Sequence, residues 1–424
     1  MNVNQALEYI HSVSWKGSVP GLERITKLLS LIGNPEKSLK YVHIVGTNGK
    51  GSTAAVISSV MRNAGYRVGM YTSPFIVTFN ERMQVNGEMI SDSELAEITE
   101  YIKPYADSMS DRPTEFELIT AIAFVYFYRH KCDLVVLEAG MGGEFDATNV
   151  IPSPEVAVFT NIGLDHTDFL GDTVEKIAAT KSGVIKSGCE CVMYRSSASV
   201  EDVIENKCKS LGVPFTKADF DSLASVSISL EGQVFNWKDY ENLFLPLLGA
   251  HQLRNAATAL TAVEKLKTRG FSVTEQNIRD GLLNTYWQGR FEILSREPLF
   301  IVDGGHNPQC MEALANNIRD YLPKVSLTVL TGVLADKDYT AMYDLVAPYI
   351  KEFFLVTPPS PRALDANELA KKLLIYGKPI YVCNSVADGV KKAVESAGAD
   401  GTVLAFGSLY MIGDIKNAVN KIKK

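Results

Sequence analysis

Short apolar runs alternate along this chain with longer segments in which apolar residues recur at helical spacing. The runs at 41–45, 133–137 and 156–160 are rich in apolar residues and have the length of buried strands. Segments at 116–130 and 250–267 have the length and spacing of helices. Strands that alternate with helices predict a parallel sheet with helical crossovers, which is the α/β class.

A glycine-rich turn follows the first of these strands: Gly46-Thr47-Asn48-Gly49-Lys50-Gly51-Ser52. The turn opens into a helix that we predict at 53–64. Strand, loop and helix in this order present backbone N–H groups and a helix N-terminus to an anion. Lys50 adds a positive charge, and the hydroxyl of Ser52 is placed to reach a metal ion on a phosphate.

This turn departs from the usual phosphate-loop pattern at two places. That pattern would have glycine at Ile44, and it would have no residue such as Gly51 between the lysine and the serine. The alternative is a plain glycine turn in an α/β protein. Because a strand precedes the turn and a helix follows it, we interpret it as a loop that binds a nucleoside triphosphate.

The alternating pattern restarts near the last third of the chain. Strand-like runs recur there at 299–302, 327–330, 353–356, 380–382 and 403–405. The fold that we predict is therefore α/β with two doubly wound domains. Residues 1–292 form an N-terminal P-loop ATPase-like domain, and residues 297–424 form a smaller C-terminal Rossmann-like domain. Alternation and turn residues at 222–240 predict a small excursion of β structure.

Polar residues follow several of the predicted strands of the first domain. Glu138 ends the strand at 133–137, Ser73 follows a strand at 66–71, and His166 follows the strand at 156–160. Ligands gather at the carboxyl ends of parallel strands. Glu138 could instead cap loop N–H groups, and His166 could be a core imidazole. Taken together, oxygen donors and one histidine predict a magnesium or manganese site rather than a zinc site.

Other candidate residues have simpler structural explanations on spacing alone. Lys181 lies near the end of a helix predicted at 172–182, where a lysine complements the helix dipole. Asn255 lies near the start of a helix and could be a cap. Asp303 and His306 flank a double glycine, either as the ends of a sharp turn or as a site that faces the nucleotide.

Composition narrows the class of protein. The chain has 424 residues and a net charge of −7, which favours more than one domain and argues against a general nucleic-acid binder. The apolar runs are shorter than the roughly 20 residues of a membrane span, and residues 1–17 do not resemble a secretory signal. The six cysteines show no metal-binding spacing, so we expect reduced thiols in a cytoplasmic protein.

The motifs together resemble those of the folylpolyglutamate synthase/dihydrofolate synthase family, a branch of the Mur ligases. The resemblance extends from residue 41 to residue 410 and rests on five motifs in the family's order. These are the glycine loop with its Lys-Gly-Ser ending, Tyr71-Thr72-Ser73-Pro74, Glu138-Ala139-Gly140-Met141-Gly142-Gly143 with Asp146-Ala147-Thr148-Asn149, Leu164-Asp165-His166, and Asp303-Gly304-Gly305-His306-Asn307-Pro308.

The resemblance implies an ATP-dependent ligase that joins L-glutamate to a carboxylate of a folate through an acyl phosphate. It implies two magnesium ions, with ligands among Ser52, Ser73, Glu138 and His166. Lys50, Lys181 and His166 would serve catalysis, and Lys181 resembles the lysine that is carbamylated in the family.

The resemblance also implies nucleotide contacts from both domains. The glycine loop, Asn255 and Arg290 would contribute from the first domain, and Asp303 and His306 from the second. We expect a monomer that binds no nucleic acid and no membrane. The loop around Phe75 differs from that of some family members, which leaves open whether dihydropteroate is also accepted. The alternative from another class is a nucleotide-binding switch without ligase activity.

Overall fold

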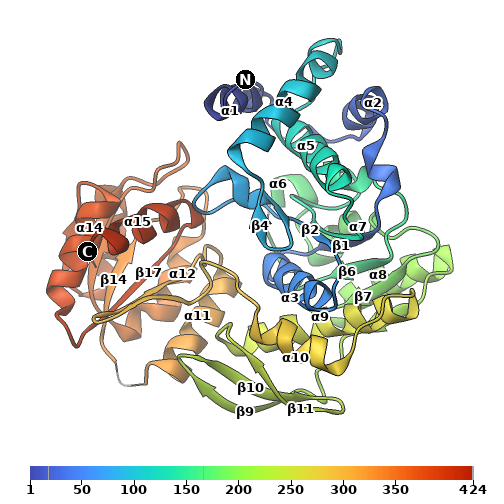
Figure 1. Cartoon of the computed structure of the whole chain (residues 1–424). Coiled ribbons are helices and arrows are strands. Elements are labelled where there is room, and N and C mark those ends of the chain that lie inside the picture. Colours follow the sequence, from blue (N-terminus) through green and yellow to red (C-terminus); the bar gives the residue numbers. More distant parts are fainter. Residues whose placement is uncertain (18, 166, 324, 423–424) are drawn as a thin grey trace.

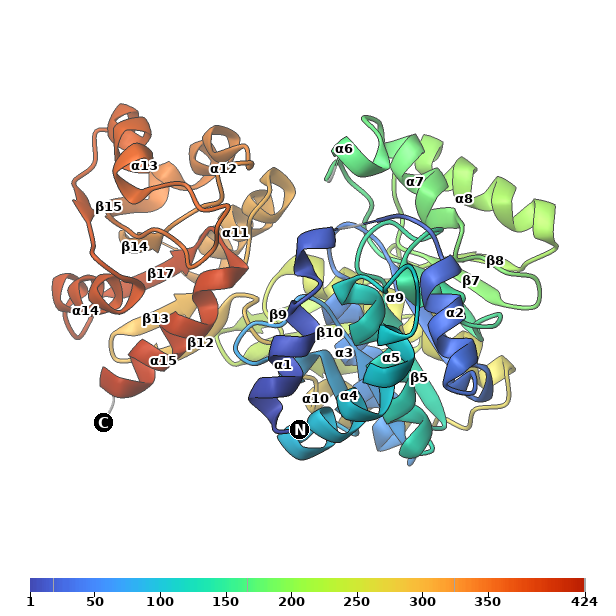
Figure 2. The same ribbon diagram turned by 90° about the horizontal axis from the view of Figure 1, so that it is seen from above.

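The computed structural model describes residues 1–17, 19–165, 167–323 and 325–422, which form two α/β lobes that lie side by side (Figure 1). Each lobe is built around its own large, mostly parallel sheet. The predicted fold class, with two doubly wound domains, is confirmed. A 90° rotation shows the helices of the smaller lobe on both sides of its strands (Figure 2).

The sheet of the larger lobe has eight strands in the order β4-β3-β2-β5-β1-β6-β7-β8. Six of them run parallel: β1 (Tyr41–Val45), β2 (Val68–Tyr71), β5 (Leu134–Glu138), β6 (Val156–Phe159), β7 (Glu190–Met193) and β8 (Phe215–Lys217). Two antiparallel strands complete one edge, β3 (Met83–Val85) and β4 (Glu88–Met89). A tight hairpin turn joins them, and Asn86 and Gly87 both have positive φ there, as such a turn requires.

Strand β1 is central, and all five of its residues are buried. Its two faces contact different helices because successive side chains point to opposite sides. Val42 and Ile44 belong to the core formed with α3 (Lys50–Asn63), α9 (Ala250–Thr268) and α10 (Glu275–Leu283). Tyr41 belongs to the core on the other face, with helices α1 (Val3–His11), α2 (Glu23–Leu31), α4 (Asp92–Asp107) and α5 (Glu115–Arg129).

The remaining helices of the larger lobe lie towards the β6–β8 edge. They are α6 (Thr167–Leu170), α7 (Val174–Ser182) and α8 (Ala198–Leu211). Helix α7 contributes Ile177 and Ala178 to a core with Val45 and Phe159, which fixes the end of α7 next to the end of β1. The predicted β excursion is confirmed as an antiparallel sheet of β9 (Ala224–Ser229), β10 (Gly232–Trp237) and β11 (Tyr240–Leu245).

The sheet of the smaller lobe has the order β12-β13-β17-β14-β15-β16. Its strands are β12 (Glu292–Arg296), β13 (Leu299–Val302), β14 (Leu327–Thr331), β15 (Ile350–Leu355), β16 (Ile380–Val382) and β17 (Thr402–Phe406), and β12 pairs antiparallel with β13. Helices α11 (Pro308–Tyr321), α12 (Tyr339–Val346) and α13 (Ala366–Leu373) cover one face. Helices α14 (Val386–Ala397) and α15 (Ile412–Ile422) cover the other.

Short 3-10 turns complete the path of the chain: η1 (Ser14–Lys16), η2 (Pro35–Ser38), η3 (Phe79–Arg82), η4 (Ala147–Val150), η5 (Ala347–Tyr349), η6 (Leu374–Tyr376) and η7 (Leu409–Met411). The six cysteines all lie in the described ranges and are free thiols, and five of them are buried. Within those ranges, no helix combines the length and the apolar character that crossing a bilayer would take.

Candidate active site

A cavity of about 830 Å³ lies between the two lobes. The carboxyl ends of β1, β2, β5 and β6 meet at this cavity because they are neighbours in one parallel sheet. The N-terminal turns of α3 and α11 reach it from the two lobes. Several of the residues predicted from the sequence line it: the glycine loop 46–52, Ser73, Glu138, Lys181, Asn255, Arg290, Asp303 and His306. His166 lies outside the described residues.

The glycine loop connects β1 directly to α3, which begins at Lys50, earlier than the predicted start at residue 53. Gly49 occupies the N-cap position with φ of 88°, and no side chain of the described residues caps the helix there. The first N–H groups of α3 are therefore left for another partner. Uncapped N–H groups and the positive end of the helix dipole together attract an anion.

Tertiary contacts explain why glycine occupies two positions of the loop. A Cβ on Gly49 would lie 2.6 Å from Oδ1 of Asn255, and a Cβ on Gly51 would lie 2.3 Å from Cζ2 of Trp287. Real Cβ atoms do not approach other atoms so closely. The inserted Gly51 is thus required by the packing of Trp287 against the first turn of α3.

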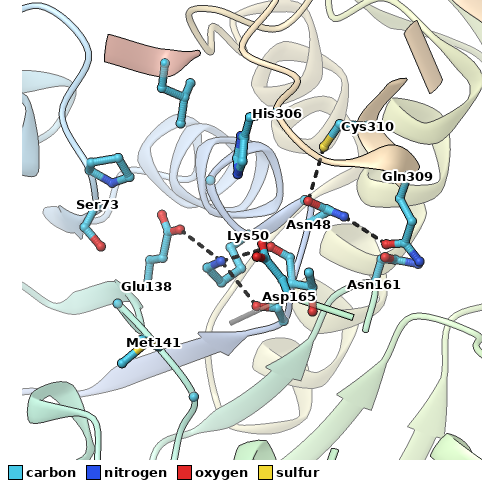
Figure 3. Close-up of a pocket in the computed structure, with 18 of the residues that line it drawn as sticks. Asn48, Lys50, Ser73, Glu138, Met141, Asn161, Asp165, His306, Gln309 and Cys310 are labelled. Carbon is cyan, nitrogen blue, oxygen red and sulfur yellow. Dashed lines mark hydrogen bonds and ion pairs between the residues drawn. The ribbon is translucent and has the colours of Figure 1, made fainter. Parts of the chain in front are cut away.

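Lys50 folds back over its own loop. Its Nζ donates hydrogen bonds to the carbonyl oxygens of Gly46 and Thr47, both at 3.2 Å. The same Nζ lies 3.9 Å from Oε1 of Glu138 (Figure 3). The charge of Lys50 is consequently directed at the space between the loop and the end of β5, where a phosphate would replace the loop carbonyls as its partner.

Glu138 is the last residue of β5 and is only 4% exposed. Burial raises the pKa of its carboxyl group to about 7, although the charges of Lys50 and Arg290 oppose that rise. Figure 3 shows Glu138 and Ser73 next to each other at the edge of the cavity. The nearby positive charges offset only part of the cost of burying this carboxylate, so it is a good partner for a cation.

The donor set suits a hard divalent ion. Within the described residues, no three His, Cys, Asp or Glu side chains gather as a protein-only metal cage. Ser52, Ser73 and Glu138 instead offer two hydroxyl oxygens and one carboxylate on the same cavity wall. Magnesium is held in this way by few protein oxygens, with water and phosphate oxygens completing its shell. The residues present therefore fit magnesium.

Lys181, in the last turn of α7, is buried with 3% exposure. A lysine that only complements the helix dipole would keep its charge in water. Here the Nζ donates a hydrogen bond to the carbonyl oxygen of Gly46 at 3.0 Å, inside the cavity. Burial, assisted by the charge of Lys50, lowers the pKa of Lys181 to about 7. A large fraction of this amine is uncharged near neutral pH.

The loop after β5 is held by a buried carboxylate. Asp146 accepts hydrogen bonds from the backbone N–H of Met141 at 2.8 Å and of Thr148 at 3.0 Å. The hydroxyl of Thr148 is in turn 2.9 Å from Nε2 of His43, whose pKa burial lowers to about 3. This hydrogen-bonded chain keeps the loop next to α7, where a Cβ on Gly143 would lie 2.8 Å from Cα of Lys181.

On the smaller lobe, Asp303 follows β13 and is buried at the cavity wall. Both of its carboxylate oxygens are used within the fold. They accept hydrogen bonds from the backbone N–H of Phe291 at 2.8 Å and of Gly305 at 2.7 Å. Asp303 therefore holds the segment that carries Arg290, and Arg290 lines the cavity.

His306 is also held by the backbone. Its Nδ1 lies 3.0 Å from the carbonyl oxygen of Gly304, and burial lowers its pKa to about 4. The imidazole is therefore neutral near pH 7 and donates through Nδ1. In the larger lobe, Asn255 is buried near the start of α9 and donates to Oε1 of Gln252 at 3.1 Å.

Contacts across the cavity bring in Gln309 and Cys310, which the sequence analysis did not assign to the site. The side-chain amide of Asn48 donates to Oε1 of Gln309 at 3.0 Å. Its Oδ1 accepts from Sγ of Cys310 at 3.3 Å (Figure 3) and from Nδ2 of Asn307 at 3.1 Å. The Asn307-Pro308 pair predicts a helix cap, but nothing in the sequence pairs it with Asn48.

A further pair joins the lobes. Nζ of Lys337 lies 3.4 Å from Oδ1 of Asp165. Lys50 and Arg290 from the larger lobe and Lys337 from the smaller lobe thus bring cationic side chains to the same cavity. This arrangement is suited to a polyanion that bridges the lobes.

Comparison with known proteins identifies the fold family. Residues 44–263 match the Mur ligase middle domain, and residues 289–409 match the Mur ligase glutamate ligase domain. A Bacillus subtilis protein named dihydrofolate synthase/folylpolyglutamate synthase is 36% identical over 423 residues, with 97% of each chain covered. A folylpolyglutamate synthase of Lacticaseibacillus casei is 37% identical over 431 residues, with 99% of each chain covered.

Solved structures agree with these matches. The structure of E. coli FolC in complex with DHPP and ADP has a TM-score of 0.87 and 31% sequence identity. The match covers 100% of this chain and 99% of that one. Because the likeness covers whole chains, it extends to both lobes. The chain therefore belongs to the folylpolyglutamate synthase/dihydrofolate synthase family of Mur ligases.

Proposed function

We propose that this protein is a folylpolyglutamate synthase, an ATP-dependent ligase that adds L-glutamate to the terminal carboxylate of a folate. The observation that carries the proposal is the uncapped glycine loop with Lys50 beside the buried Glu138, in a cavity that both lobes line. Its relatives named as folylpolyglutamate synthases, and the ADP complex of the E. coli protein, support the same reaction.

The chemistry requires activation of the acceptor, because an amine does not displace oxide from a carboxylate. A carboxylate oxygen of the folate attacks the γ-phosphorus of ATP, and ADP leaves. The product is an acyl phosphate. The neutral amine of glutamate then attacks the acyl carbon and loses a proton, and phosphate leaves as the amide forms. The protein must hold three substrates in line and offset negative charge.

The glycine loop and Lys50 would hold the β- and γ-phosphates. The N–H groups at the start of α3 lack a side-chain cap within the described residues, and Lys50 has only carbonyl partners and the more distant Glu138. Phosphate oxygens would accept hydrogen bonds from the N–H groups of α3 and from Lys50. Asn255 and Arg290, together with Asp303 and His306 from the second lobe, are proposed as the surroundings of the rest of the nucleotide.

Magnesium is the proposed metal at two positions. Ser52 would hold one ion on the phosphates, and Ser73, Glu138 and His166 would hold the second. When bound, magnesium supplies positive charge to the transferring phosphoryl group. The buried carboxyl of Glu138 is kept near this position by the pairing of β5 with β1, in which Ile44 and Glu138 are in register.

We further propose that Lys181 carries a carbamate. The uncharged amine attacks carbon dioxide and loses a proton, so the side chain becomes a carbamate anion. The pKa of about 7 and the burial of Lys181 favour the uncharged amine that this step needs. A ¹³C carbamate signal after incubation with labelled bicarbonate, present in the wild type and absent in Lys181→Met, would test it.

The chain's organisation is proposed as residues 1–292 and 297–424, acting as a monomer in the cytoplasm. Dihydropteroate is a second candidate acceptor, because the B. subtilis relative carries both activities in its name. It offers a carboxylate that the same cavity would activate. Side-by-side assays with dihydropteroate and tetrahydrofolate would decide between one acceptor class and two.

The test of the proposed function is the dependence of ADP release on each substrate. Purified protein should release ADP only when a folate, glutamate and magnesium are all present. ATP turnover that needs neither a folate nor a pteroate would reject the ligase and favour a nucleotide-binding switch. The amide product, identified by mass spectrometry, would distinguish ligation from simple hydrolysis.

A further inference from the structure

Arg82 presents a cation to the cavity without an anionic partner. It ends η3 and lines the cavity together with Ser73 and Glu138. Its side chain forms no hydrogen bond or ion pair with any residue of the described ranges, and Nε is a buried donor left unsatisfied. A guanidinium group in this position is unusual, because buried donors are nearly always satisfied.

The position of Arg82 is fixed by the loop that carries it. Its carbonyl oxygen accepts a hydrogen bond from the N–H of Thr72 at 3.0 Å, so Arg82 lies at the neck of a loop that also carries Ser73. Glu81 organises the rest of that loop. Its carboxylate accepts hydrogen bonds from the N–H groups of Ile76, Val77 and Thr78 at 2.7 to 2.8 Å.

The side chain of Arg82 is stacked as well as unpaired. Its Cζ lies 5.2 Å from the ring centre of Phe75 and 5.6 Å from that of Phe79. Such stacking fixes the plane of the guanidinium group and leaves its edge free to donate. The positive charge of Arg82 also acts on the buried hydroxyl group of Tyr71. Burial raises the pKa of that hydroxyl, and the charge of Arg82 opposes the rise.

Two acidic residues near this loop, Glu81 and Glu117, hold other groups, although Oε1 of Glu117 is a buried acceptor without a partner among the described residues. Glu81 holds three backbone N–H groups of its own loop. Glu117, across the cavity wall, accepts from Nε of Arg24 at 3.0 Å and from the N–H of Thr114 at 2.6 Å. Glu138 lines the cavity with Arg82 but faces Lys50 and forms no ion pair with Arg82 in the described structure, so a ligand carboxylate is the partner that Arg82 lacks.

The surroundings of Arg82 identify the kind of ligand. Val19, Pro74 and Phe116 line the same cavity as Arg82 and give it an apolar and aromatic wall. A flat aromatic acceptor fits such a wall better than free glutamate, which is small and polar. Because the reacting carboxylate must meet the phosphates near Lys50, the acceptor has to pass close to the neck of the loop.

We propose that Arg82 binds the carboxylate of the folate acceptor that does not react. The inference rests on the proposed function. The glutamyl end of a folate has two carboxylates, of which one is activated and the other stays charged. Pairing the second with Arg82 fixes which oxygen faces the γ-phosphate. Dihydropteroate has a single carboxylate, so Arg82 also distinguishes the two acceptor classes.

The test compares two acceptors in two proteins. One acceptor is tetrahydrofolate, and the other is the same molecule with the non-reacting carboxylate converted to a primary amide. The wild type should use the amide with a kcat/KM lower by roughly 10- to 100-fold, the value of a charge-assisted hydrogen bond. Arg82→Met keeps the length of the side chain, and it should use both acceptors about equally and poorly. Arg82→Lys should recover part of the preference.

Arg129→Met is the matched control. Arg129 stacks on Tyr101 at 5.4 Å in the same way, but it lies outside the cavity and is paired with Glu97. This variant should keep the wild-type preference. If Arg82→Met loses all turnover, calorimetry on protein with an unchanged Tm replaces the assay. The ratio of the dissociation constants of the two acceptors then measures the preference.

Three outcomes would overturn the inference. They are a wild type that does not discriminate against the amide, an Arg82→Met variant that discriminates as strongly as the wild type, and a loss confined to the KM for glutamate. These three outcomes differ from the outcome expected if the proposed function itself is wrong. If it is wrong, the wild type releases no ADP with tetrahydrofolate, glutamate and ATP.

Discussion

The two lobes present the same structural unit to the cavity but use it differently. In the larger lobe, the buried strand β1 leads through a glycine loop to α3, and in the smaller lobe β13 leads through Asp303-Gly304-Gly305-His306 to α11. Gly49 leaves the N-terminus of α3 without a side-chain cap among the described residues. Asn307 caps α11, because its Oδ1 accepts from the N–H of Cys310 at 2.9 Å.

The difference shows how one unit serves binding in one lobe and positioning in the other. Helix N-terminal N–H groups need acceptors, and a capping side chain supplies one from within the chain. Where the cap is absent, the N–H groups stay open to an acceptor from outside the chain, such as a bound anion. The polar groups of the second loop are used similarly, since Asp303 accepts from Gly305 and Phe291. The larger lobe thus leaves its polar groups open to substrates, whereas the smaller lobe uses its polar groups to hold its own loop in place.

The largest expected effect is that of Glu138→Gln, which removes a carboxylate from the cavity wall of the larger lobe. We expect kcat for ligation to fall by about 100- to 1000-fold, because the charge that offsets the bound cation is lost. Nucleotide binding, measured by calorimetry, should persist. Thermal stability should not fall, since the carboxyl group is buried and its ionised form is disfavoured. Ligation at the wild-type rate would show that the metal assignment is wrong.

Lys181→Met should have opposite effects on catalysis and on stability. Ligation should be lost, while the unfolding free energy at pH 7 should rise by about 1 kcal/mol or more in unmodified protein, because a buried amine is costly to charge. The unfolded state of the wild type binds more protons between pH 7 and the ordinary pKa of lysine. Its stability relative to the variant should therefore rise as pH increases from about 7.

Urea denaturation of both proteins at several pH values measures this difference. Carbamate-free protein, prepared without dissolved carbon dioxide, is the reference. A wild type whose stability relative to the variant is independent of pH across this range would contradict the lowered pKa of Lys181.

Gly51→Ala tests whether close packing shapes the glycine loop. The new Cβ would lie 2.3 Å from Trp287, so the indole ring must move. Overpacking of this kind costs typically about 1 to 3 kcal/mol. We expect a lower Tm and a higher KM for ATP, because Trp287 lies close in sequence to Arg290. The double variant with Trp287→Phe should be less affected, and equal losses in both would contradict the packing explanation.

The smallest effect is expected at the capped helix. Asn307→Ala should lower the unfolding free energy by about 1 kcal/mol, the usual value of an N-cap. Asn307→Asp keeps the acceptor for Cys310 N–H but loses the donor to Asn48, so it serves as the control. It should keep the stability and change only the KM for ATP. A large loss of kcat in both variants would show that the second loop takes part in the chemistry.

Much of the fold was predictable because it depends on local pattern. The apolar run at 41–45 corresponds to β1 without change, and the β structure predicted at 222–240 is the antiparallel sheet of β9 to β11. The placement of Ser73 and Glu138 on one cavity wall also followed from sequence, because parallel strands end at the same edge of a sheet. The first turn of α3 was missed, since Lys-Gly-Ser is a poor helix start on propensity and is stabilised there by contacts with α9 and Trp287.

The sequence by itself determined the class of fold, the order of strands, loops and helices, and the residues that meet at the edge of the first sheet, because periodicity and strand direction are local properties. Only the tertiary structure decided the burial of Lys181, the contacts of Asn48 with α11 and the unpaired state of Arg82 within the described residues. Each depends on segments distant in the chain, whose contact sets desolvation and charge. No local pattern encodes which of several lysines or arginines will lose its water.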